Sequence, residues 1–190
     1  MNKILYLFIL IPVFFSGCAI SPLTTSNKVQ CVISGISEDD VVRAQKEWGE
    51  AIVSIGKAYS EKKNYQALAT QVVNNLYAYD EGTVLFKPTK AAERQFRLNK
   101  TDAISYFVKG NIHEDHGFAL KPWSRVRFEN AGIDISSHSA IAMGNYYFTD
   151  AKTGQETKVE FTFGYIKDEK GKLLISLHHS SLPYTPTSHH

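Results

Sequence analysis

Residues 172–183, which read KLLISLHHSSLP, are the stretch from which the fold is inferred. Every second residue from Leu173 to Leu177 is apolar, and a period of two is typical of a β-strand with one face in a core. Alternate side chains of a strand share a face, so this face continues as His179 and Ser181. The segment therefore predicts a strand that carries an imidazole and a hydroxyl inward behind apolar residues.

The same alternation predicts that His178 and Ser180 point to the opposite face of the strand. Buried polar groups need hydrogen-bond partners, so His179 and Ser181 at the end of an apolar face indicate a polar pocket in the interior. The alternative is a strand whose end simply emerges into solvent.

The strand at 172–181 is the last of four runs of alternating character. The other three are 124–135, 139–149 and 157–167. Short links that contain Gly, Ser, His or Asp join these runs, as in β-hairpins, so the sheet should be mostly antiparallel. In the third run, every second residue from Val159 to Tyr165 is apolar and should face the core.

Helices are expected before the strands. Ser37 precedes acidic residues and starts a long helix, and Asn64 starts a second one. Gly49 and Gly56 inside the long helix indicate close approach to a neighbouring backbone. A short helix begins near 99–101, while residues 91–97 fit a helix or a strand equally well. Helices followed by a meander of strands predict an α+β fold in which a curved sheet wraps the long helix.

The composition fits one globular domain. Of 190 residues, 43% are hydrophobic, which is enough for a sizeable core. The formal net charge of +2 comes from 21 basic and 19 acidic residues, and no basic run interrupts the sequence. Binding to nucleic acid is therefore not expected, because a phosphate backbone calls for clustered positive charge.

The amino terminus has the layout of an export signal. Lys3 precedes an apolar run that ends at Phe15, and small residues follow, as in a secretory signal peptide over residues 1–18. The run is too short to span a bilayer. Phe15 to Cys18 resembles a bacterial lipoprotein box, although Phe15 stands where Leu is usual. Lipidation of Cys18 would tether the protein to a membrane.

Three further segments are expected after residue 18. Residues 19–30 are expected to form a flexible tether, residues 31–184 one domain, and residues 185–190 a disordered tail. Ala19 after the lipidated Cys favours outer-membrane anchoring, so the protein is expected to be exported to the periplasm. If Cys18 is lipidated, Cys31 has no intrachain disulfide partner.

One cluster of residues has the composition of a metal site. Residues 113–116, His-Glu-Asp-His, are of types that suit zinc or manganese, but they lack a helical register and a third partner at a known spacing. A solvated turn is the favoured interpretation. The sequence contains no Gly-rich phosphate loop, HExxH motif or nucleophile elbow, which argues against the common hydrolases and nucleotide-binding proteins.

Several segments together resemble the iota class of carbonic anhydrases. They are residues 83–89, 103–111, 117–130, 140–150, 158–173 and 177–183. This class is related to the association domain of calcium/calmodulin-dependent kinase, and the resemblance covers nearly the whole predicted domain. It implies a cone-shaped barrel of the nuclear-transport-factor-like type and the interconversion of carbon dioxide and bicarbonate.

The resemblance also implies a pocket inside the cone, with catalytic residues Thr89, Tyr106, His179 and Ser181. The three hydroxyls would hold a water and the bicarbonate oxygens, and His179 would accept or relay the proton. No cofactor is expected. Some members of the class use zinc or manganese, and in that case His178 and His179, or the two histidines of residues 113–116, are the candidate ligands.

Two other function classes stay open. The same cone serves as an oligomerisation module in kinases, and it also forms small-ligand binders and isomerases. An isomerase would need an inward carboxylate as its base, and the alternation places Glu160 and Asp134 outward. A homodimer is expected in either case, because the exposed sheet of this superfold often pairs.

Overall fold

The computed structural model describes residues 35–186 of the chain. The predicted signal peptide with Cys18, the tether, Cys31 and residues 187–190 lie outside this range. Among residues 35–186, no helix is both long enough and apolar enough to cross a membrane.

The described part of the chain has the expected α+β fold, with helices first and most strands last. The elements are α1 (Glu38–Ser60), α2 (Tyr65–Leu76), β1 (Leu85–Lys87), α3 (Lys100–Val108), the 3-10 helix η1 (Phe118–Leu120), β2 (Trp123–Ile135), β3 (Ser139–Asp150), β4 (Glu156–Lys167) and β5 (Leu173–Ser181). The four predicted strand runs are confirmed to within a residue or two. Residues 91–97, which fitted either a helix or a strand, form neither.

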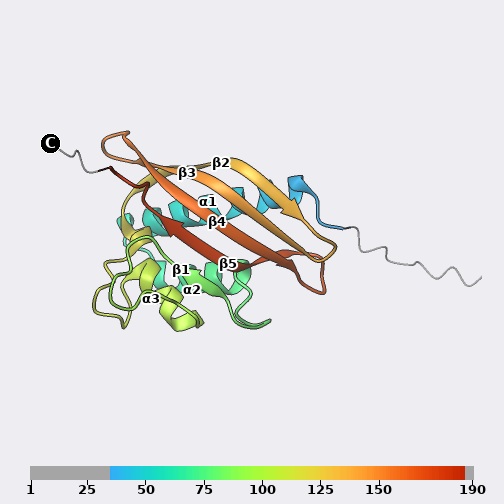
Figure 1. The fold of residues 1–190 in the computed structure, drawn as a ribbon. Coiled ribbons are helices and arrows are strands. Elements are labelled where there is room, and N and C mark those ends of the chain that lie inside the picture. Colours follow the sequence, from blue (N-terminus) through green and yellow to red (C-terminus); the bar gives the residue numbers. More distant parts are fainter. Residues whose placement is uncertain (1–34, 187–190) are drawn as a thin grey trace, which may run out of the picture. The chain divides into compact units, whose positions relative to one another are not determined.

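One curved sheet organises the domain. Its strand order is β1-β5-β4-β3-β2, and only the β1–β5 pair is parallel. Figure 1 shows α1 behind β2 to β5, with α2, α3 and β1 gathered on the β5 side. Because β1 and β2 are edges that do not pair with each other, the sheet is open and does not close into the expected barrel.

The helix starts follow local hydrogen bonds. Ser37 caps α1 by accepting from the Asp40 N–H, and the Asp40 carboxylate accepts from the Ser37 N–H at 2.9 Å, which completes a capping box. Asn64 caps α2 through the Ala67 N–H. Asn99 caps α3. The predicted helix starts are confirmed.

The two glycines of α1 mark close contacts, as expected. A Cβ on Gly56 would lie 2.8 Å from the carbonyl oxygen of Ala119, and one on Gly49 would lie 3.1 Å from the Cβ of Val126. Real Cβ atoms do not tolerate the first distance. The glycines therefore let α1 press against η1 and β2.

Trp48 of α1 fills the concave face of the sheet. Its ring makes edge-to-face contacts with Tyr146 of β3, Phe163 of β4 and His178 of β5, at centroid distances of 5.8, 5.5 and 5.4 Å. Such aromatic pairs contribute about 0.5–1.5 kcal/mol each beyond the apolar area that they bury. This packing fixes which residues of each strand face inward.

The inward residues at the end of β5 differ from the prediction. Tyr165 pairs with Ile175, but Gly164 pairs with Leu177, so Ser176 is an extra residue in β5 and forms a β-bulge. A bulge shifts the alternation by one residue. The prediction that His179 and Ser181 point inward is therefore wrong, and His178 and Ser180 face the core instead.

Candidate functional site

Four hydroxyl groups from four separate segments meet on the concave side of the sheet. Thr89, in the loop after β1, donates a hydrogen bond from Oγ1 to Oγ of Ser180 on β5 at 2.8 Å. The phenol of Tyr146 on β3 is hydrogen-bonded to both of these side chains. Tyr106 on α3 lies near Tyr146, and its phenol oxygen accepts from the backbone N–H of Lys90. We call Thr89, Tyr106, Tyr146 and Ser180 the hydroxyl cluster.

The structure brings Thr89 and Tyr106 together as expected, but with Ser180 in place of Ser181. Ser180 is only 3% exposed. Ser181 lies on the other face of β5, where its hydroxyl donates to the Glu160 carboxylate at 3.0 Å. His179 is exposed on that same outer face. The hydroxyl cluster therefore includes two of the four residues that the resemblance suggested.

Burial keeps the phenols of the cluster protonated. Desolvation raises the pKa of Tyr106 above its ordinary value, and it raises the pKa of Tyr146 as well. Tyr106 is 5% exposed and Tyr146 is 1% exposed. Both phenols therefore remain neutral hydrogen-bond donors throughout the pH range in which proteins function.

A chain of three buried side chains ends at His178, on the same face of β5 as Ser180. Trp48 donates from Nε1 to the hydroxyl of Tyr77 at 2.9 Å, and that hydroxyl lies 2.9 Å from Nδ1 of His178. Phe86 stacks on the imidazole at a centroid distance of 4.6 Å. Burial and the nearby His179 lower the pKa of His178 well below its ordinary value, so the ring is neutral.

Hydrogen-bond counting assigns the proton of this neutral ring. The indole of Trp48 can only donate, so the Tyr77 hydroxyl uses a lone pair to accept from it. The hydroxyl hydrogen of Tyr77 is then satisfied if Nδ1 of His178 accepts it. This arrangement leaves the imidazole proton on Nε2, which is buried and has no partner among the described residues. His178 thus has an unused donor in the interior.

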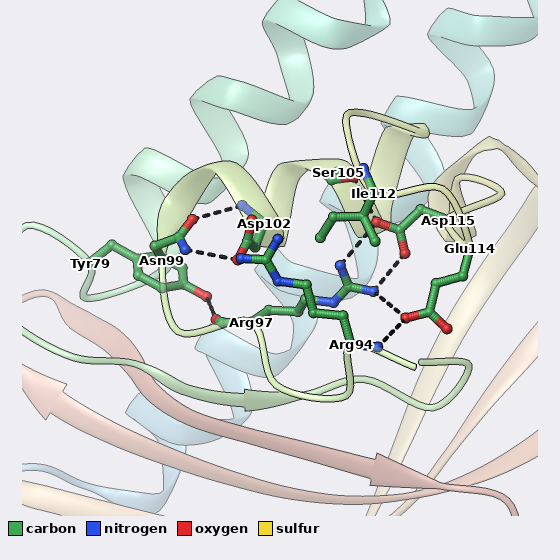
Figure 2. Close-up of polar contacts among 9 residues, drawn as sticks. All are labelled: Tyr79, Arg94, Arg97, Asn99, Asp102, Ser105, Ile112, Glu114 and Asp115. Atoms are coloured by element: carbon green, nitrogen blue, oxygen red, sulfur yellow. Dashed lines mark hydrogen bonds and ion pairs between the residues drawn. The ribbon is translucent and has the colours of Figure 1, made fainter. Parts of the chain in front are cut away.

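The carboxylate of Glu114 holds the loop after β1, which carries Thr89 of the hydroxyl cluster. Glu114 accepts from three consecutive backbone N–H groups, those of Ala92, Glu93 and Arg94, at 2.8, 3.0 and 2.8 Å. These bonds fix the segment just after Thr89. Figure 2 shows Glu114 and its neighbour Asp115 turned toward the loop between β1 and α3.

Asp115 joins the same loop to α3. Arg97 is fully buried and donates to both carboxylate oxygens of Asp115, at 3.1 and 2.7 Å (Figure 2). Ser105, next to Tyr106, donates to Asp115 at 2.6 Å. The interpretation of residues 113–116 as a solvated turn is wrong for the two acidic residues, because their carboxylates set the spacing between the Thr89 loop and α3.

The pKa of Glu114 gives a testable dependence of stability on pH. The backbone N–H bonds lower this pKa from 4.5 to about 2, so between these values the unfolded chain binds a proton that the folded chain does not. The contribution of Glu114 to stability is complete above pH 4.5 and is lost as the pH falls toward 2. Urea unfolding should show that wild type loses more stability than Glu114→Gln between about pH 5 and 2.5.

Glu93→Gln is the matched control, since it removes a neighbouring exposed carboxylate. It should follow the wild-type pH curve. Equal acid sensitivity of Glu114→Gln and wild type would contradict the assigned role of Glu114.

The possible metal ligands do not form a site. His178 and His179 point to opposite faces of β5, so they cannot bind one ion together, and Nδ1 of His178 is already hydrogen-bonded. Among residues 35–186, no group of three or more His, Cys, Asp or Glu side chains is arranged to hold a metal ion. The donor set therefore does not fit zinc or manganese.

Tyr146 and Ser180 were not predicted as site residues, although the sequence contains a pattern that indicates the position of each. Tyr146 shares its face of β3 with buried Ala142, and the alternation of that run indicates this. The inward turn of Ser180 depends on the bulge, and Gly164 inside a strand is the kind of signal that marks one. A Cβ on Gly164 would lie 3.0 Å from the Cβ of Leu177.

The helices, the curved open sheet and the hydroxyl cluster define an α+β protein that carries a polar site on the concave face of its sheet. The chain matches the family model of metal-independent carbonic anhydrases over residues 39–182. It is 45% identical over 166 residues to a metal-independent carbonic anhydrase from Nostoc sp., which covers 85% of this chain and 80% of the relative. The chain belongs to the family of metal-independent carbonic anhydrases.

Solved structures agree with this assignment. The crystal structure of a cyanobacterial iota-carbonic anhydrase complexed with bicarbonate superposes with a TM-score of 0.77 and 44% identity, over 80% of this chain and 95% of that one. A structure from Catenulispora acidiphila shares the fold alone, with a TM-score of 0.50 and 12% identity, over 75% of this chain and 88% of that one. The enzyme interpretation and the iota-class resemblance are confirmed.

Proposed function

We propose that this enzyme interconverts carbon dioxide and bicarbonate at the hydroxyl cluster, without a metal ion. The observation that carries the proposal is the contact between Thr89 and Ser180, flanked by two buried phenols. Four neutral hydroxyls in an apolar interior offer donors and acceptors to a small substrate. The bicarbonate complex of the 44% identical cyanobacterial enzyme supports this assignment.

The reaction needs a held water and a stabilised negative charge. In hydration, a lone pair of the water oxygen forms a bond to the carbon of carbon dioxide, one C=O electron pair moves onto oxygen, and one proton leaves. Thr89 and Ser180 hold the water by hydrogen bonds. Tyr106 donates to the oxygen on which charge develops, and such preorganised donors are most effective where bulk water is excluded. The released proton passes along the hydroxyls to solvent.

His178 takes over part of the role that was expected of His179. Its low pKa makes it a poor base, but its Nε2–H is an unused donor on the same strand face as Ser180. It supplies a second hydrogen bond to the substrate oxygens. The buried rings of Phe161, Phe163 and Trp123 keep water scarce around an apolar gas molecule.

An activity assay tests the proposal directly. The purified protein should accelerate carbon dioxide hydration in pH-indicator stopped-flow measurements. Treatment with a chelator followed by gel filtration should leave the rate within about twofold of the untreated value. Loss of activity on chelation, with recovery on adding zinc or manganese, would contradict the metal-free mechanism.

The homodimer stays a prediction, and the outer face of the sheet supports it. Ile141 and Met143 of β3 are about half exposed there, as is Leu85 of β1. Exposed apolar side chains on one sheet face are typical of an interaction surface. Light scattering should give twice the mass of the purified chain, and a monomer mass would rule the dimer out.

Export to the periplasm and anchoring to the outer membrane through Cys18 are likewise proposed from the sequence of residues 1–18. They would give the enzyme access to carbon dioxide outside the cytoplasm. Mass spectrometry of the protein purified from its native membrane fraction should find a lipid-modified Cys18 as the first residue, and an unprocessed Met1 would contradict this.

A further inference from the structure

A hollow beside α3 and η1 reaches Tyr106 of the hydroxyl cluster. Its volume is about 450 Å³, and its wall includes the rings of Tyr106, Phe118 and Trp123. Two lysines, Lys90 and Lys109, are exposed and also line it. The hollow therefore joins a buried catalytic phenol to a positively charged surface.

The positive charges around this hollow outnumber its negative ones, because Lys90, Lys109 and Arg97 carry three positive charges and Glu114 and Asp115 carry two negative ones. Glu114 is occupied by backbone N–H groups and Arg97, and Asp115 is occupied by Arg97 and Ser105. Among residues 35–186, Lys90 and Lys109 form no ion pair within 4.0 Å. Their charges are therefore available to an anion that approaches from solvent.

A third lysine, Lys121, also lines this hollow. The Lys121 ammonium lies 4.2 Å from the centroid of the Trp123 ring, in cation–π geometry, and 3.2 Å from the Asp150 carboxylate. These contacts fix the position of the Lys121 ammonium, and the Asp150 carboxylate partly neutralises its charge. Lys121 thus shapes the hollow, while Lys90 and Lys109 supply its free charge.

Tyr106 links this hollow to the reacting groups. Its phenol oxygen accepts from the backbone N–H of Lys90, which leaves the phenol hydrogen to be donated elsewhere. Thr89, the neighbour of Lys90, belongs to the hydroxyl cluster. An anion formed at the cluster meets first a neutral phenol donor and then two free ammonium groups.

We propose that this hollow is the path by which bicarbonate leaves and enters the site, and that Lys90 and Lys109 draw the anion along it. The proposal rests on the proposed function, because only one of the two substrates carries a charge. Carbon dioxide is neutral, so the lysines do not attract it. A cleft with one sign of charge raises the local concentration of the opposite ion and its rate of association.

The test is the dehydration of bicarbonate at increasing ionic strength. In the double variant Lys90→Gln/Lys109→Gln, kcat/KM for bicarbonate should fall about threefold to tenfold at low salt. Wild-type kcat/KM should fall between about 0.01 and 0.15 M salt, as the screening length shortens from about 30 to about 8 Å. The double variant should have a flatter salt dependence.

Reversing the charge of the two lysines distinguishes a loss of electrostatic attraction for bicarbonate from damage to the fold. Lys90→Glu/Lys109→Glu should be slower still at low salt and should become faster as salt is added, because screening then removes a repulsion. Lys170→Gln removes one positive charge from the exposed link between β4 and β5, away from the hollow, and it should match wild type in rate and in salt dependence. Equal melting temperatures of all variants confirm that the fold is kept.

The outcomes also distinguish this inference from the proposed function. An active wild type whose lysine variants retain its kcat/KM and salt dependence would overturn the bicarbonate path and leave the hydroxyl cluster standing. A wild type without hydration activity would overturn both. Because the equilibrium constant ties the two directions together, kcat/KM for carbon dioxide hydration should change by the same factor as for dehydration.

Discussion

Replacing Ser180 with Ala should lower the rate of carbon dioxide hydration about 100-fold, the loss expected when one preorganised hydrogen-bond donor is removed from a site that stabilises developing charge. The variant deletes the group that Thr89 donates to and that contacts Tyr146. The held water then loses its position as well as a partner. pH-indicator stopped flow on the purified variant measures the effect, and thermal melting checks that the fold is intact.

The adjacent serine provides the control. Ser181 has the same chemistry but faces the outer side of β5, where it donates to Glu160. Ser181→Ala should keep its activity within about twofold of wild type, the range expected for loss of one exposed hydrogen bond far from the reaction. If Ser181→Ala is the inactive variant and Ser180→Ala is active, the assignment of the inner face is wrong.

The two serines also show where inference from this sequence stops. Helix caps, strand runs and the inward face of β4 follow from local chemistry, because capping and alternation involve residues close together in the chain. The inner face of β5 does not, because Ser176 adds one residue relative to Gly164 and reverses the alternation from that point. Strict alternation assumes that each residue has a partner, and a bulge breaks that assumption.

The roles of Glu114 and Asp115, in the loop before η1, could not be predicted from neighbouring residues in the sequence either. Glu114 binds backbone groups about twenty residues earlier in the chain, and Arg97 reaches Asp115 across the same gap. Exposed and buried carboxylates look alike in a sequence. The family resemblance suggested Thr89 and Tyr106 as site residues, and the folded chain shows which contacts hold these two residues in place.

Replacing Asp115 with Asn should destabilise the protein by about 3–5 kcal/mol, because removing one partner of a buried ion pair leaves the other charge uncompensated. Arg97 would keep only its 3.4 Å contact with Glu114 as an ion pair. The loss also weakens the tie from Ser105 to the loop. Urea unfolding at neutral pH should show a lower midpoint, and hydration activity at 15 °C should fall with the loss of spacing between Thr89 and Tyr106.

Asp134→Asn is the matched comparison, since it makes the same chemical change at an exposed position of β2. It should leave stability within about 0.5 kcal/mol of wild type. Similar unfolding midpoints for both variants would show that Asp115 is solvated in the folded protein, contrary to its burial beside Arg97. Arg97→Met should resemble Asp115→Asn in its loss of stability, because either change leaves one buried charge without its partner.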